Sequence, residues 1–205
     1  MEHPPPLGLA AIDQHNWRAA LAVEVTPGQL GYVAGYQPVA FVILAKAYVR
    51  PGDLDWEPLA VTSGAFVVAA VALAHSRTHT ELLHLAVDAP RQGQGVGSAS
   101  VELLVAHVVK TRRAAEDVRL TVHPENERGL HLSRSRGFLP NGRCATASLS
   151  GRRASSEGKC RYMLSGAWRR TASTKFGSWH RARLLSSPAR SMGGLRRSAA
   201  CSLNT

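Results

Sequence analysis

The sequence predicts an α/β protein in which helices flank a mixed, mostly antiparallel central sheet. Two apolar runs at residues 59–62 and 65–74 are joined by a Ser-Gly pair, a pattern typical of a β-hairpin. A glycine-rich segment, 91–98, lies between an apolar strand pattern and an apolar helix pattern. A further strand pattern at 118–122 leads into another helical stretch. Hairpins combined with strand–helix units favour a sheet with both pairing directions.

Three helices are expected before the hairpin, over residues 16–25, 27–35 and 39–49. The second has the clearest start signal, because Thr26 is a good N-cap and a proline follows at the first helical position. Gln29 stands three residues after Thr26, as a capping box requires. The third helix is expected to end at a Pro-Gly pair.

The segment before the glycines predicts a strand over residues 81–87, since polar and apolar positions alternate. Successive side chains of a strand point to opposite faces. We therefore expect Glu81 on the same face as Val87, with His84 on the opposite face as a packing residue. A last strand is expected over 159–164.

The glycine-rich segment reads Arg91-Gln-Gly-Gln-Gly-Val-Gly-Ser98 and is followed by a helix pattern over about 97–113. A strand that enters such a turn and opens a helix leaves several backbone N–H groups aimed at one point, which suits a phosphate or pyrophosphate. The segment is not the nucleotide P-loop, because no Gly-Lys-Ser/Thr follows. Its glycine spacing also differs from the dinucleotide fingerprint.

The spacing Gln92-x-x-Gly95-x-Gly97 resembles the acyl-CoA pyrophosphate loop of the GNAT superfamily of N-acetyltransferases, Arg/Gln-x-x-Gly-x-Gly/Ala. The resemblance covers roughly residues 10–165. It implies the GNAT fold, acetyl-CoA as co-substrate and no metal.

A second block downstream resembles the family pattern Asn-x-x-Ala-x-x-Leu-Tyr-x-x-x-Gly-Phe. The residues that match are Asn126, Leu132, Gly137 and Phe138. Two residues depart from the pattern: Gly129 replaces the usual alanine, and Ser133 replaces the usual tyrosine.

The resemblance implies a set of cofactor-contacting residues on the loop, on the preceding strand and in the second block. They are Leu85, Ala86, Val87, Gln92, Gly93, Gln94, Gly95, Val96, Gly97, Ser98 and Asn126. The backbone N–H near Val87 is expected to meet the thioester carbonyl, and a splayed strand at 85–87 is expected to pair with the pantetheine. Asn126 is expected to bond to the cofactor or to the strand–helix turn, or to act as a helix N-cap.

Glu81 is the expected base, because a carboxylate in this strand accepts the amine proton in several family members, often through water. The alternative is a strand-end carboxylate in solvent. Ser133 occupies the position of the family's acid, and a serine hydroxyl is a poorer and shorter donor. A water chain, His131 or His123 could protonate the thiolate instead, or activity could be reduced.

The opening Asn16 to Ala34 resembles that of polyamine N-acetyltransferases of the spermine/spermidine type, whose pattern includes Val-x-Pro-x-Gln-x-x-Phe-Val-Ala. Three acidic residues before the hairpin, Asp53, Asp55 and Glu57, could attract an alkyl-ammonium substrate or simply face solvent. We therefore expect acetyl transfer to a primary amine of a small cationic, polyamine-like substrate. The alternatives are a catalytically weak acyl-CoA-binding protein and an acetyltransferase of a protein or peptide amine.

Charge divides the chain into two parts. Residues 1–133 carry 10 Lys/Arg and 13 Asp/Glu, which gives a formal net charge of −3. Residues 134–205 carry 15 Lys/Arg and 1 Asp/Glu, which gives +14. An acidic body favours a cationic substrate. We expect a flexible N-terminus over 1–9, the acetyltransferase domain over 10–165, and a disordered basic tail over 166–205 that could also be a frame-shifted end.

The tail could contact nucleic acid non-specifically, which is not expected to be the function. Three well-separated cysteines argue against a disulfide framework and for a reducing compartment. The chain begins without signal-peptide character, and its longest apolar run, 65–74, is too short to span a bilayer. The expectation is a cytoplasmic protein without membrane contact. A homodimer is among the expected partners, because members of the family often dimerise.

Overall fold

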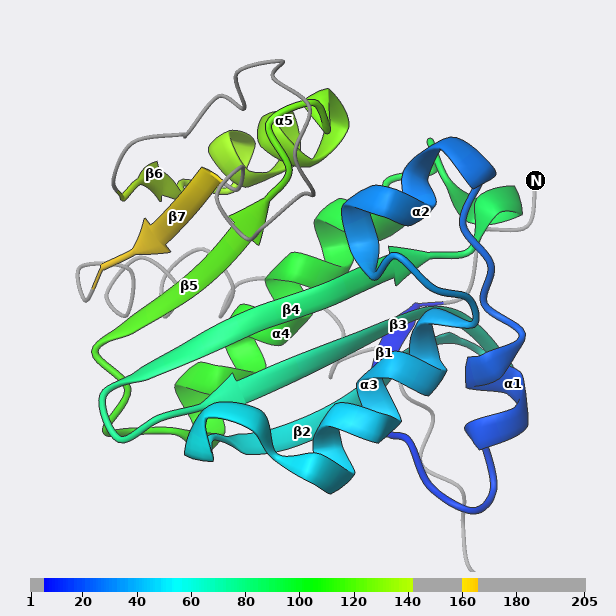
Figure 1. Cartoon of the computed structure of the whole chain (residues 1–205), viewed down its shortest axis with the longest axis horizontal. Helices are drawn as coiled ribbons and strands as arrows, with labels where there is room; N and C mark the ends of the chain where they lie inside the picture. The colour runs from blue at the N-terminus through cyan, green and yellow to red at the C-terminus, as the bar shows by residue number, and fades with distance from the viewer. Residues whose placement is uncertain (1–5, 142–159, 166–205) are drawn as a thin grey trace, which may run out of the picture.

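The computed structural model describes residues 6–141 and 160–165. It contains one seven-stranded sheet in the order β1-β2-β3-β4-β5-β7-β6 (Figure 1). The strands are β1 Leu7–Ala11, β2 Asp55–Ser63, β3 Phe66–His75, β4 His79–Val87, β5 Asp117–Val122, β6 Leu139–Pro140 and β7 Cys160–Leu164. Only β4 and β5 pair in parallel within this part of the chain. The predicted mixed, mostly antiparallel sheet is therefore confirmed.

Helices cover both faces of the sheet (Figure 1). On one face lie α1 Trp17–Leu21, α2 Pro27–Val33 and α3 Val39–Val49, and on the other lie α4 Val96–Thr111 and α5 Glu127–Ser135. Two short 3₁₀ turns, η1 Pro51–Asp53 and η2 Ala89–Arg91, follow α3 and β4. Each face of the sheet has its own apolar cluster, so the central strands β3 and β4 are buried from both sides.

Most elements agree with the sequence predictions. The hairpin β2–β3, the helix α3 and the strand–turn–helix unit β4–α4 all form. The α4 side chains at helical spacing are each at most 4% exposed: Val101, Leu104, Val105 and Val108. The backbone N–H of Thr26 donates to Gln29 Oε1 at 3.3 Å, as the capping box predicts. Helix α1 is shorter than predicted and ends at Leu21.

The edge strand β1 was not predicted, and it begins three residues before the expected start of the domain. Its pairing with β2, Leu7 opposite Ser63, joins segments far apart in the sequence. A Cβ added at Gly8 would lie 2.9 Å from Thr62 Oγ1, so this glycine permits the close approach of the two strands.

The sequence analysis argued against a disulfide framework, and Cys160 departs from that expectation. This residue begins β7, is 2% exposed and is disulfide-bonded. Sequence separation between cysteines does not report whether the fold brings two of them together, so the spacing argument could not detect this bond. The basic tail over 166–205 lies outside the described residues.

Candidate active site

A β-bulge interrupts β4 at the centre of the site. Ala70 pairs with Ala86 and Ala72 with Leu83, so two residues of β4 oppose one residue of β3. His84 lies at this bulge with a φ of 57°, in the left-handed region. Such a conformation is uncommon for a residue with a side chain.

The bulge changes which residues share a face of β4. Leu83 packs in the cluster beneath α3, whereas Leu85 and Val87 pack in the cluster near α4. The predicted alternation is therefore wrong beyond Leu83: Glu81 and Leu83 do not share a face with Val87, and His84 lies on the α3 face rather than opposite Glu81. Sequence periodicity could not detect this change, since the extra residue shifts the alternation by one position.

The strands β4 and β5 separate beside the bulge, as Figure 1 shows. Their parallel pairing runs from His79–Asp117 to Leu82–Leu120 and then stops. Within the described chain, residues 83–87 therefore have no pairing partner on β5. This open edge is the splayed strand that the sequence analysis expected at residues 85–87, and its backbone is available to an extended ligand.

The glycine-rich loop presents backbone to open space. Gly93 and Gly95 have φ values of 75° and 80°, and a Cβ at either position would meet nothing within 4 Å. Gly95 is the N-cap of α4, and no side chain in the described part of the protein caps this helix. The first N–H groups of a helix lack intrahelical partners and carry the positive end of its dipole. The loop therefore fits a pyrophosphate group.

Gln92 connects this loop to two other elements. Its side-chain amide forms reciprocal hydrogen bonds with Gln29 of α2, at 3.0 and 2.9 Å. Its Nε2 also donates to the backbone oxygen of Val87 at 2.9 Å. The side chain thus holds the loop against α2 and the end of β4. The sequence analysis treated Gln29 as a capping residue and as part of the polyamine-type pattern, and it missed this contact.

The second sequence block forms α5 and reaches the loop. Asn126 is the N-cap, and its Oδ1 accepts the N–H of Gly129 at 2.9 Å. A Cβ at Gly129 would lie 2.7 Å from Asn126 Nδ2 and 2.9 Å from Val122 Cγ1, so alanine would not fit without a shift. Leu132 lies 3.5 Å from the position of a Cβ at Gly97, which brings the two blocks into contact.

Ser133 is buried, and its hydroxyl is committed to the helix backbone. The side chain is 4% exposed, and Oγ donates to Gly129 O at 2.7 Å. This geometry leaves the hydroxyl proton within α5.

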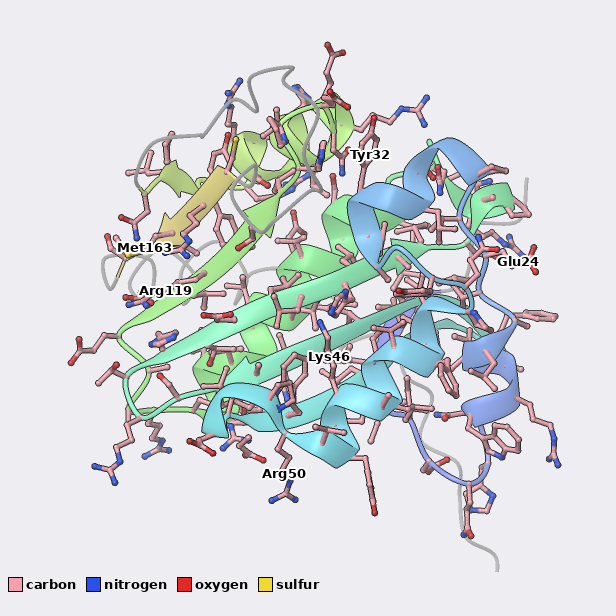
Figure 2. The ribbon with its side chains drawn as sticks, viewed as in Figure 1. Glu24, Tyr32, Lys46, Arg50, Arg119 and Met163 are labelled. Carbon is pink, nitrogen blue, oxygen red and sulfur yellow. The ribbon has the colours of Figure 1, made fainter. Side chains whose placement is uncertain are left out.

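Helix α2 lies over the open edge of β4. His84 Nδ1 is 2.8 Å from Val33 O, and His84 Nε2 is 2.7 Å from Lys46 Nζ of α3. Tyr32 projects from α2 toward the end of β5, where its ring lies 4.9 Å from that of His123 (Figure 2). Lys46 extends from α3 over the sheet in the same view. The sequence analysis assigned no role to Tyr32 or Lys46.

Two concave regions lie on the α3 face. A cavity of about 220 Å³ is lined by residues of β4, β5 and β7 that include Glu81, Leu83, Arg119 and Arg161. The carboxylate of Glu81 is 3.6 Å from His79 Nε2. A larger open groove of about 500 Å³ follows α3 and is lined by Tyr36, Gln37, Phe41, Val42, Ala45, Lys46, Val49 and Pro51.

Two of the acidic residues before the hairpin are engaged on the α4 side of the sheet. Asp55 bonds to Arg112 at 2.7 Å. Glu57 bonds to His75 of β3 at 2.9 Å and to His107 of α4 at 2.8 Å. The pKa of the Glu57 carboxyl is lowered, mainly by the hydrogen bond from His75. Burial acts in the opposite direction, and the contact with His107 lowers the pKa further.

The described residues contain no group of histidine, cysteine and carboxylate side chains that could hold a metal ion. Nor is any helix among them both long and apolar enough to cross a membrane.

A family comparison agrees with this geometry. The acetyltransferase (GNAT) family model matches residues 9–138, more than half of the chain. The protein therefore belongs to the GNAT family and is an N-acetyltransferase that uses acetyl-CoA as co-substrate. No curated protein matches the sequence.

Solved structures of several acetyltransferases are similar in fold. Spermidine N-acetyltransferase from Vibrio cholerae, in complex with CoA and spermine, has a TM-score of 0.60 at 17% identity, covering 80% of this chain and 98% of that one. The ribosomal-protein-S18-alanine N-acetyltransferase of Escherichia coli has a TM-score of 0.56 at 19% identity, covering 78% and 94%. AAC(6′)-Ib in complex with paromomycin and acetyl-CoA has a TM-score of 0.62 at 13% identity, covering 82% and 98%. At these identities the likeness shows the fold alone.

Proposed function

We propose that this protein transfers the acetyl group of acetyl-CoA directly to the primary amine of a small cationic molecule. The observation that carries the proposal is the glycine loop at the N-terminus of α4 directly after β4, whose residues 83–87 have no partner on β5 in the described chain. A pyrophosphate on the loop would direct the rest of acetyl-CoA along the open edge of β4. The acceptor would then approach from the α3 face.

Within this proposal, each group of the chain has a distinct task. The N–H groups at residues 93–98 bind the pyrophosphate, and the backbone near Val87 orients the thioester carbonyl. Glu81 takes the proton of the ammonium group through water, because its carboxylate opens into a cavity on the acceptor face. Asn126 supports the site by capping α5.

The acceptor has two candidate forms. The resemblance to spermine/spermidine enzymes favours a polyamine. The groove along α3 favours an amine with a single charge and an apolar body, because its described lining is mainly apolar, has Lys46 as its charged residue and contains no carboxylate. A second ammonium group near Lys46 would meet like charge. Asp55 and Glu57, engaged on the α4 side, are not available to offset it.

A panel of acceptors tests the proposal. The assay measures CoA release by the purified full-length chain with spermidine, spermine, hexylamine, phenethylamine, an aminoglycoside and a peptide with a free N-terminus, with product masses recorded. Acetylation of spermidine would select the polyamine form, and preference for hexylamine or phenethylamine would select the apolar monoamine. Acetylation of the peptide alone would replace the small-molecule proposal. CoA binding without transfer to any amine would support the acyl-CoA-binding alternative.

A further inference from the structure

We infer that Tyr32 of α2 donates the proton to the departing thiol sulfur, a role that the family pattern assigns to the residue at position 133. This inference rests on the proposed function. It begins from two departures in the sequence: Ser133 stands where the second block has tyrosine, and Tyr32 stands where the polyamine-type pattern has phenylalanine. The chain thus lacks the tyrosine of the pattern in α5 and carries an additional tyrosine in α2.

Ser133 is not positioned to replace the missing phenol. Its hydroxyl proton is directed to Gly129 O at 2.7 Å, and its side chain is 4% exposed. Donation to a ligand would require breaking this bond and leaving a buried carbonyl with one partner fewer. His131 lies on the exposed side of α5.

The position of α2 brings Tyr32 to the open edge of β4. Gln29 bonds to Gln92 of the glycine loop, and Val33 O bonds to His84 at the bulge. These contacts fix α2 at two points, one turn apart, along the path expected for the pantetheine. Tyr32 lies between them in the helix.

The ring of Tyr32 crosses from the β4 side of the opening to the β5 side. It lies 4.9 Å from the ring of His123, which follows the last residue of β5, with an interplanar angle of 30°. His123 is itself oriented, because its Nδ1 accepts the N–H of Glu125 at 3.3 Å. The stack therefore holds the phenol of Tyr32 between α2 and the end of β5, beside the opening along which the pantetheine is expected.

The other tyrosines are not placed for this role. The chain has 4 tyrosines. Tyr162 is 1% exposed within the core beneath α4, whereas Tyr36 and Tyr48 are 74% and 90% exposed on the α3 side. Tyr32 is half-buried and lies at the opening.

The step balances as a simple acyl transfer. The neutral amine attacks the thioester carbonyl carbon, a C–N bond forms, and the C–S bond breaks. The sulfur takes its electron pair and the proton of the Tyr32 hydroxyl, giving free CoA. Glu81 releases the first ammonium proton to solvent and then takes the second proton of the nitrogen through water, and the Tyr32 phenolate regains a proton from solvent. No oxidant or metal is required.

The test compares Tyr32→Phe with a matched control, Tyr48→Phe, which removes the same oxygen from an exposed side chain of α3. Tyr32→Phe keeps the aromatic stack and removes one oxygen. We expect kcat to fall about a hundredfold, which is the lower end of the usual range for a positioned acid, because the leaving thiol is only weakly basic. The Kd for acetyl-CoA, measured by calorimetry, is expected to stay unchanged. Tyr48→Phe is expected to behave as the wild type.

Adding Ser133→Tyr to Tyr32→Phe restores the phenol on α5 and is expected to recover most of the lost kcat. Three results would overturn the inference: an unchanged kcat in Tyr32→Phe, a loss of acetyl-CoA affinity as large as the loss of kcat, or no recovery in a folded double variant. Folding is checked by the melting temperature. If the wild-type chain acetylates no amine, the proposed function fails, and that result is distinct from an active wild type with an equally active Tyr32→Phe variant.

Discussion

Gln29 and Gln92 are 63 positions apart in the sequence, yet their side-chain amides form two reciprocal hydrogen bonds, at 3.0 and 2.9 Å. The pair joins α2 to the glycine loop, and the further bond from Gln92 to Val87 O joins both to the end of β4. Helix α2, which lies over the open edge of β4, and the loop that fits the pyrophosphate are thus held by one contact. Binding at the loop and the position of α2 should therefore be coupled.

Gln92→Ala is expected to weaken CoA binding about tenfold, equivalent to about 1.4 kcal/mol. The reason is that three hydrogen bonds that hold the loop are lost, while the backbone N–H groups themselves remain. Calorimetric titration with CoA measures the effect. Gln14→Ala, at an exposed position before α1, is the matched control and should bind as the wild type. Equal affinities in all three proteins would contradict the coupling.

Gly95→Ala is expected to weaken CoA binding and lower the free energy of unfolding by about 1–2 kcal/mol, because a Cβ is unfavourable at a φ of 80°. Gly28→Ala is the matched control, since Gly28 lies in α2, and a Cβ there meets nothing within 4 Å. Alanine in that helix should be neutral or stabilising by up to about 1 kcal/mol. Urea unfolding with and without CoA distinguishes the two variants. A Gly95→Ala variant with native stability and affinity would show that the loop tolerates a side chain.

The sequence predicted the parts of the fold whose signals are local. The capping pattern at Thr26 and the helical spacing of Val101, Leu104 and Val108 needed only neighbouring residues, and each was confirmed. The strand β1 needed a partner strand far away in the sequence, Leu7 pairing with Ser63 and Ala11 with Leu59, and the sequence analysis missed it.

In the site, too, only the features with a local sequence signal could be predicted. The glycine loop and the second block could be found from spacing, and the structure brings them together through Leu132 and Gly97. The bulge at His84 could not be found, because it depends on how β3 and β4 align. For the same reason, the contact of Tyr32 with His123 has no sequence signal: it joins α2 to the end of β5 across the opening.

The variants Glu81→Gln and His84→Asn test which of these two residues, both near the proposed acceptor side, acts as the base. If Glu81 accepts the amine proton, Glu81→Gln should lower kcat about a hundredfold or more with little change in the KM for acetyl-CoA. Asparagine tolerates positive φ, so His84→Asn keeps the bulge and removes the contacts to Val33 and Lys46. We expect it to lower the melting temperature and to reduce kcat less than Glu81→Gln does. A larger kcat loss in His84→Asn would transfer the role of base to His84.

Glu57 supplies a test of stability away from the site. Its carboxylate joins β2 to His75 of β3 and His107 of α4, and these bonds hold its pKa below the ordinary value of 4.5. A lowered pKa in the folded state means that the stabilisation is fully present above about pH 4.5 and is lost as the pH falls through the folded pKa.

Glu57→Gln should therefore lower the free energy of unfolding by about 1 kcal/mol at pH 7, a modest value because the carboxylate is partly exposed to solvent. The difference from the wild type should shrink as the pH falls below 4.5, because the wild-type carboxyl then becomes neutral as well. Asp55→Asn, on the same strand, removes the more exposed pair with Arg112 and should cost at most about 0.5 kcal/mol. Urea titrations at pH 7 and in acid measure all three proteins. A penalty for Glu57→Gln that persists unchanged in acid would show that packing, and not the charge of Glu57, holds this junction.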